Sequence, residues 1–95
     1  GLYILDEPEA ALSPLRQMSL VARLHQLVQR RSQFLIATHS PIIMAYPNAN
    51  ILQLTAQGII RVSYTETEYY TLTKAFLNKH EMMLRELMGD SDNPG

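Results

Sequence analysis

The chain has 95 residues, of which 46% are hydrophobic, and its formal net charge is −1. These values describe one small globular domain or a piece of a larger one, and they exclude the strong overall positive charge of a protein that coats nucleic acid. Because the chain contains no cysteine, a disulfide framework, a zinc–thiolate site and a thiol nucleophile are excluded, and we expect a cytoplasmic location. No apolar run approaches the roughly 20 residues of a membrane-spanning helix.

The N-terminal half of the chain has the pattern of a strand–helix–strand unit, which we place at residues 1–46. The apolar run at residues 2–5 is typical of a strand buried in a parallel sheet. A serine and a proline then provide a helix start, and apolar residues at helical spacing predict a helix over residues 15–31. The segment "FLIAT", residues 34–38, is a second buried strand. Two such strands joined by a helix pair in parallel, so an α/β fold follows.

The sequence of the C-terminal half predicts a short helix, a β-hairpin and a final helix, in that order. A short apolar piece at residues 42–46 should form one or two helical turns. The strand runs "NILQL" and "IIRVSY", joined around "AQG", predict a β-hairpin within residues 50–64. After the polar connector "TETEYY", apolar spacing predicts one C-terminal helix within residues 70–89. We expect residues 90–95 to fray beyond the glycine that stops this helix.

Polar side chains follow both strands of the predicted parallel pair. Asp6 and Glu7 come directly after the first strand, and His39 follows the second. The carboxyl ends of neighbouring parallel strands meet at one edge of the sheet, where open α/β sheets bind ligands. One carboxylate there would hold a hydrated Mg²⁺, the other would position or deprotonate a water, and the imidazole would bind a terminal phosphate oxygen. The sequence therefore predicts a magnesium–phosphate site.

These residues lie in two segments that resemble motifs of one family. "LYILDEPEAALSP" resembles the Walker B segment and D-loop of ABC-type ATPases, and "FLIATHSP" resembles their H-loop, or switch segment. The resemblance implies that Asp6 holds Mg²⁺, usually through water, that Glu7 orients or activates the attacking water, and that His39 contacts the γ-phosphate of ATP. It places a D-loop, which meets the partner subunit of a dimer, at Glu9, Ala10, Ala11, Leu12 and Ser13. The implied fold is the C-terminal portion of a P-loop NTPase domain.

Two departures from the family pattern refine this interpretation. Transporter-type members usually have aspartate at the position of Ser13, so the chain is more similar to the soluble branch of predicted bacterial ATPases. No GxxxxGK[ST] phosphate loop and no LSGGQ-like signature occurs in the sequence. We therefore expect both motifs before Gly1 in a larger parent ATPase that acts as a homodimer, and we expect the 95 residues alone to bind ATP poorly or not at all.

Plainer interpretations apply to several of the remaining polar residues. Ser13 is better suited to cap a helix than to act as a nucleophile, and Ser40 is predicted to cap the short helix after it. His25 and His80 lie within helical patterns and receive no role. A nucleic-acid patch has little support, because the basic residues that would form it fit a solvated helix face: Arg16, Arg23, Arg30 and Arg31.

Two alternatives to a soluble ATPase stay open from the sequence. The parent would be the energising subunit of a membrane transporter in the first, and a non-catalytic interaction module that has kept an ATPase fold in the second.

Overall fold

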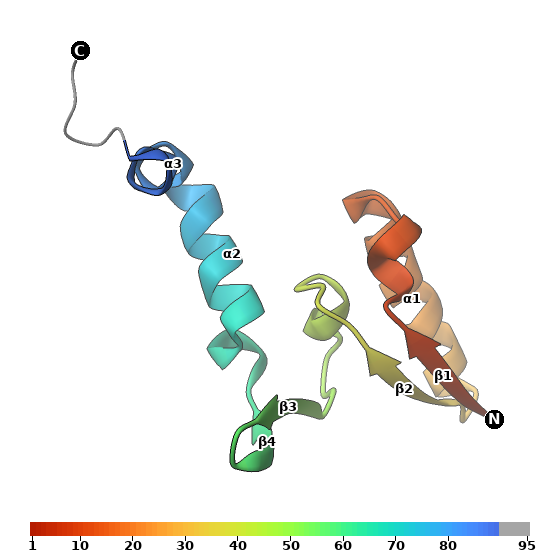
Figure 1. The fold of residues 1–95 in the computed structure, drawn as a ribbon. Coiled ribbons are helices and arrows are strands. Elements are labelled where there is room, and N and C mark those ends of the chain that lie inside the picture. Colours follow the sequence, from red (N-terminus) through yellow and green to blue (C-terminus); the bar gives the residue numbers. More distant parts are fainter. Residues whose placement is uncertain (90–95) are drawn as a thin grey trace.

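The structure is a computed structural model that describes residues 1–89 of the chain (Figure 1). The expectation of a frayed end at residues 90–95 lies outside this range. In the first half of the described chain, β1 (Leu2–Asp6) and β2 (Gln33–Ala37) form a parallel pair joined by α1 (Pro14–Gln29). The α/β fold is therefore confirmed, and each boundary lies within two residues of its predicted position.

Local chemistry sets both ends of α1. The side-chain oxygen of Ser13 accepts a hydrogen bond from the backbone N–H of Arg16 at 3.2 Å, and Pro14 occupies the first helical position, so the predicted cap is confirmed. The helix ends at Gln29, and Arg31 just beyond it has a left-handed backbone conformation, with φ at 68°. This turn directs the chain back along the sheet into β2.

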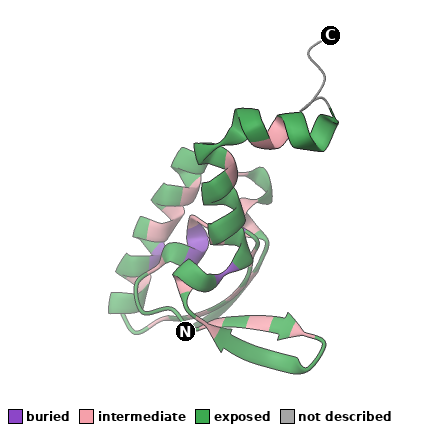
Figure 2. Ribbon diagram, turned by 90° about the vertical axis from the view of Figure 1, so that its left-hand side faces the viewer, coloured by how far each residue is buried: buried purple, intermediate pink, exposed green. Residues whose placement is uncertain are grey.

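The two faces of the parallel pair differ in what covers them. Helix α1 and the 3₁₀ turn η2 (Ile43–Ala45) lie over one face, and Figure 2 shows the buried residues gathered in one small region. The buried apolar side chains are Leu24, Ile43 and Met44. Side chains alternate between faces along a strand, and the register pairs Ile4 with Leu35, so these two share the opposite face with Leu2. All three are mostly exposed, which leaves that face uncovered within the described chain.

The predicted β-hairpin is confirmed. Strands β3 (Ile51–Thr55) and β4 (Gly58–Val62) pair antiparallel in the register that joins Thr55 to Gly58. Gly58 has φ at 120°, a conformation that side-chain-bearing residues rarely adopt, so glycine is needed at the end of this turn. One face of the hairpin carries exposed apolar side chains: Leu52, Leu54 and Ile59.

The prediction of a single C-terminal helix is wrong, because the structure has two helices there. Helix α2 (Glu68–Asn78) ends where the backbone N–H of Lys79 donates to the carbonyl oxygens of Ala75 and Phe76, at 3.0 and 3.2 Å. Lys79 itself has φ at −135° and ψ at 36°, which breaks the helix, and α3 (His80–Met88) starts at the next residue. Apolar residues keep their helical spacing across this break, so the periodicity of the sequence gave no sign of it.

The connector before α2 is also more ordered than predicted. It contains a 3₁₀ turn, η3 (Tyr64–Glu66), and the first residues of α2. Thr67 joins the two elements and is buried: its hydroxyl donates to the carbonyl oxygen of Tyr64 at 2.8 Å and accepts from the backbone N–H of Tyr70 at 3.2 Å. We call residues 64–88 the C-terminal arm.

The described chain is elongated. Its Cα radius of gyration is 16.9 Å and its extents are 60 × 35 × 20 Å, whereas a compact domain of this length would have a radius of about 12 Å. The C-terminal arm accounts for the elongation, since it runs away from the strand–helix–strand unit (Figure 1). Between residues 1 and 89, no helix combines the length and apolar character needed to cross a membrane.

Candidate functional site

The backbone of Glu7 turns sharply at the carboxyl end of β1. Its N–H donates to the carbonyl oxygen of Ala37 at 2.7 Å, which adds one bond to the β1–β2 ladder. Glu7 then adopts a left-handed conformation, with φ at 46° and ψ at 56°. This region costs a side-chain-bearing residue about 1–3 kcal/mol, and strain of this kind is concentrated at functional sites. Arg31 and Asn48 share a positive φ, so this conformation makes Glu7 a candidate functional residue only together with its side-chain contacts.

Glu7 and His39 meet at this edge of the sheet, as the sequence predicts. The Oε1 atom of Glu7 lies 2.7 Å from the Nδ1 atom of His39, and the two side chains are 51% and 62% exposed. So exposed a pair adds little to stability, because solvent screens the interaction. The exposure instead leaves both groups open to a ligand.

Glu9 holds the loop that carries His39. One carboxylate oxygen of Glu9 accepts a hydrogen bond from the Thr38 hydroxyl at 2.6 Å, and the other accepts from the backbone N–H of His39 at 2.9 Å. The hydroxyl of Thr38 in turn accepts from the N–H of Ser40 at 3.0 Å. The pKa of Glu9 is lowered. Partial burial alone would raise this pKa, but its effect is outweighed by the hydrogen bonds from Thr38, from His39 and from the N–H of Glu9, together with the charge of the nearby imidazole. The ionised carboxylate is the form that fits this site.

Glu9 has a role that the sequence interpretation did not give it. The resemblance placed it in a loop that meets a partner subunit, but its carboxylate is engaged within the chain. These hydrogen bonds join the loop after β1 to the loop after β2. Glu9 lies 29 positions before Thr38 and 30 before His39, and no local sequence pattern signals a contact over such a separation. Thr38 was missed for the same reason.

Three candidate ligands for a cation lie together, but Asp6 is outside this group. Donor atoms of Glu7, Glu9 and His39 lie within 4.8 Å of one another. Mg²⁺ prefers oxygen ligands and keeps several waters, and both oxygens of Glu9 already accept hydrogen bonds from the protein. The exposed carboxylate of Asp6, which ends β1 opposite Ala37, suits a hydrated Mg²⁺ better. The role of Asp6 as a magnesium ligand stays a prediction.

Gln17 of α1 connects the loop that follows β1 to the loop that follows β2. The side-chain amide of Gln17 donates from Nε2 to the carbonyl oxygen of Leu12 at 3.1 Å, and its Oε1 accepts from the hydroxyl of Ser40 at 2.5 Å. Ser40 is 5% exposed, and its hydroxyl oxygen also accepts from the backbone N–H groups of Ile42 and Ile43. The Ser40 hydroxyl thus binds the N–H of the first residue of η2, as predicted, although Ile42 and not Ser40 directly precedes this turn.

The other predicted residues are distributed around this site. Ala10, Ala11 and Ser13 are exposed beside it, and Leu12 is half-buried. The Nδ1 atom of His25 lies 3.0 Å from the Tyr46 hydroxyl. That pair links α1 to the end of η2 and gives His25 a structural partner.

A family model matches the strand–helix–strand part of the chain. Residues 1–45 are similar to the family described as "AAA domain, putative AbiEii toxin, Type IV TA system". No curated protein matches the chain. The matched segment contains both strands of the parallel pair, Glu7, Glu9 and His39. Together, the family match and the α/β architecture support a P-loop NTPase of the AAA-like superfamily with a nucleotide-binding, ATPase-like function.

Proposed function

We propose that this chain supplies the Walker B residues, the D-loop and the switch histidine of an ABC-type ATPase that hydrolyses Mg-ATP. The contact of 2.7 Å between Glu7 and His39, at the common carboxyl edge of two parallel strands, carries the proposal. A carboxylate that orients water and an imidazole that binds phosphate have to face the same space to act on one terminal phosphate, and this contact places both groups there. We further propose that the parent protein is cytoplasmic and belongs to the soluble branch, since Ser13 departs from the transporter pattern.

The geometry of the pair assigns a role to each group. Glu7 uses one carboxylate oxygen toward His39, and the second oxygen can accept a hydrogen bond from the attacking water and orient it. In the imidazolium form both ring nitrogens of His39 are donors. Its Nδ1 would then donate to Glu7 while Nε2 donates to an oxygen of the γ-phosphate, whose charge is spread over three oxygens in the transition state.

Asp6 would hold Mg²⁺ through water at the end of β1. The ion, when bound, compensates the negative charge of the phosphates. Glu9 does not need to touch either ligand, because it fixes the backbone N–H of His39 and the hydroxyl of Thr38. The imidazole is therefore held beside the Glu7 carboxylate before ATP binds. Because the group is already in place, less free energy is needed to reorient it during the reaction.

The D-loop residues support a homodimer only in part. The carboxylate of Glu9 and the carbonyl oxygen of Leu12 already have partners within the chain. The side-chain oxygen of Ser13 is likewise engaged, in the cap of α1. We therefore narrow the proposed contact with a second subunit to the exposed residues Ala10 and Ala11.

A glutamine at position 7 tests this proposal in the intact polypeptide that carries the sequence. Glu7→Gln keeps the size of the side chain but removes the charge that orients the water, so steady-state turnover should fall about a hundredfold or more. Binding of Mg-ATP, measured by isothermal titration, should be retained, and ATP should trap the dimer in size-exclusion chromatography. Glu81→Gln in α3 is the matched control, because it removes the same charge from an exposed helix outside the site.

Three results would contradict the proposal. Turnover of Glu7→Gln at the wild-type rate would remove Glu7 from the reaction. Absence of Mg-ATP binding by the intact wild-type protein would favour a non-catalytic interaction module, and co-purification with a membrane permease would favour a transporter subunit.

A further inference from the structure

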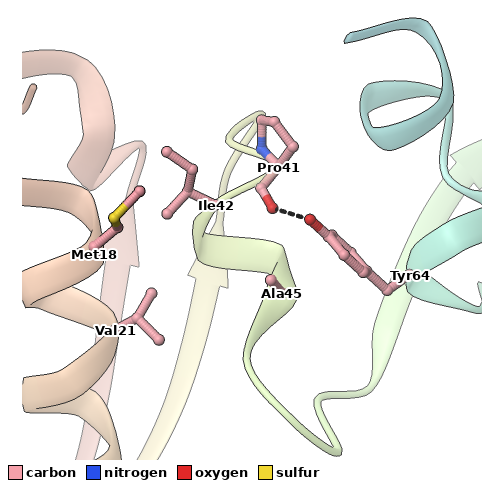
Figure 3. Close-up of a pocket in the computed structure, with 6 residues that line it drawn as sticks. All are labelled: Met18, Val21, Pro41, Ile42, Ala45 and Tyr64. Carbon is pink, nitrogen blue, oxygen red and sulfur yellow. Dashed lines mark hydrogen bonds between the residues drawn. The ribbon is translucent and has the colours of Figure 1, made fainter. Parts of the chain in front are cut away.

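The C-terminal arm begins beside the loop that carries the switch histidine. We call residues 38–42 the switch loop. The hydroxyl of Tyr64 donates to the carbonyl oxygen of Pro41 in this loop at 2.5 Å (Figure 3). Burial, with a smaller effect of Tyr70, raises the pKa of Tyr64, so the hydroxyl stays protonated and remains a donor. Tyr64 therefore joins the arm to the switch loop two residues beyond His39.

A second tyrosine of the arm packs on His39 itself. The ring of Tyr69 and the imidazole of His39 have centroids 5.3 Å apart and planes at 73°, an edge-to-face arrangement. His39 is thus held by Glu7 through Nδ1 and by Tyr69 through its ring, while Glu9 fixes its backbone N–H. The side chain is mostly exposed, so these contacts restrict an imidazole that solvent would otherwise leave free to rotate.

Tyr69 lies on a well-supported part of the arm. It belongs to the first turn of α2, and the buried Thr67 caps this turn. The rings of Tyr64 and Tyr70 pack against each other with centroids 4.9 Å apart, which ties η3 to the same turn. Tyr64 and Tyr69 consequently contact the switch loop from two elements, η3 and the first turn of α2, that are packed against each other.

The contact with the switch loop is more direct than the contact with α1. An apolar groove of about 380 Å³ lies between α1, the switch loop and Tyr64 (Figure 3). It is lined by Met18, Val21, Pro41, Ile42, Ala45 and Tyr64. The arm is therefore joined to the switch loop through Tyr64 and Tyr69, and not through close packing against α1.

We propose that Tyr69, which the C-terminal arm presents, is a positioning residue for His39. The inference rests on the proposed function, because it assumes that His39 acts on the terminal phosphate. With the ring in place, the imidazole stays beside Glu7; without the ring, the imidazole gains rotational freedom and is less often aligned.

Tyr69→Leu and Tyr69→Phe in the intact polypeptide test the inference. The leucine removes the aromatic ring, and we expect kcat for Mg-ATP to fall about three- to tenfold with KM nearly unchanged, as for an interaction that matters in the transition state. The phenylalanine keeps the ring and should restore wild-type turnover. Leu77→Ala, an exposed residue of the same helix, controls for general effects on α2.

The NMR signals of the His39 ring protons provide a readout that does not depend on turnover. A neighbouring aromatic ring shifts these signals, so they should move in Tyr69→Leu and stay in place in Leu77→Ala, and the His39→Gln variant assigns them. Either kcat or the His39 signals remaining at the wild-type values in Tyr69→Leu would overturn the inference, as would an equal fall of kcat in Leu77→Ala.

The proposed function and this inference fail in different ways. If Glu7→Gln turns over ATP at the wild-type rate, the proposed function is wrong and the inference falls with it. If Glu7→Gln is inactive while Tyr69→Leu is indistinguishable from wild type, only the inference is wrong.

Discussion

The backbone N–H of Glu7 donates to the carbonyl oxygen of Ala37 at 2.7 Å, one residue beyond the last strand residue of β1. This bond anchors Glu7 to the sheet while its φ of 46° turns the chain away from the strand direction. The side chain is thereby placed against His39 instead of continuing the alternation of the strand. A carboxylate at this position depends on a backbone conformation that glutamate disfavours.

The first prediction concerns the cost of this conformation. Glu7→Ala and Glu7→Gly both remove the carboxylate, but only glycine adopts φ of 46° without a steric penalty. We expect the glycine variant to be more stable than the alanine variant by about 1 kcal/mol, with turnover lost in both. Chemical denaturation of the two variants of the intact polypeptide measures the difference. Equal stability, or a more stable alanine variant, would show that position 7 is not strained.

The second prediction concerns the buried hydroxyl of Ser40. Ser40→Ala removes the acceptor for the N–H groups of Ile42 and Ile43 and the donor to Gln17, so unfolding should become easier by about 1–3 kcal/mol. Ser63→Ala is the matched control, since Ser63 stands at the start of a 3₁₀ turn without a side-chain capping bond. A shift in denaturation midpoint that is the same for both variants would contradict a stabilising role of the Ser40 hydroxyl.

The third prediction follows from the pKa of Glu9, which lies below its ordinary value of 4.5. A carboxyl group with a lowered pKa in the folded state contributes stability above its unfolded pKa, and this contribution is lost as pH falls through the folded pKa. The wild-type protein should therefore exceed Glu9→Gln in free energy of unfolding near neutral pH, and the difference should shrink below pH of about 4.5. Denaturation at a series of pH values from about 7 to 3 measures it.

Glu81→Gln provides the control for the pH series, because it removes one negative charge from the exposed helix α3. A difference between wild type and Glu9→Gln that grows as pH falls would reverse the sign of the linkage and contradict the hydrogen-bond pattern around Glu9.

Local signals were sufficient for much of the fold. The serine–proline pair before α1 and the hairpin turn that ends at Gly58 each act within a few residues, and both are found as predicted. The meeting of Glu7 and His39 also follows from a simple rule, since parallel strands bring their carboxyl ends to one edge.

The remaining features depend on contacts between distant segments or on a single backbone angle. Lys79 breaks the C-terminal helix although the apolar spacing continues across it. The bonds of Glu9 to Thr38 and His39, and the packing of Tyr69 on His39, join residues about 30 positions apart. Side chains of these types are common on protein surfaces, so nothing in their local sequence distinguishes them from solvated residues.

The bridge formed by Gln17 has a mechanical consequence. Its side-chain amide donates from the nitrogen to the carbonyl oxygen of Leu12 and accepts through the oxygen from the hydroxyl of Ser40. One residue of α1 thus links the loop after β1 to the loop after β2. In the homodimer proposed above, a second subunit that contacts Ala10 or Ala11 would displace Leu12, and the amide of Gln17 would transmit this movement to Ser40, the residue next to His39. One uncharged side chain would thus couple contact between the subunits to the alignment of the imidazole.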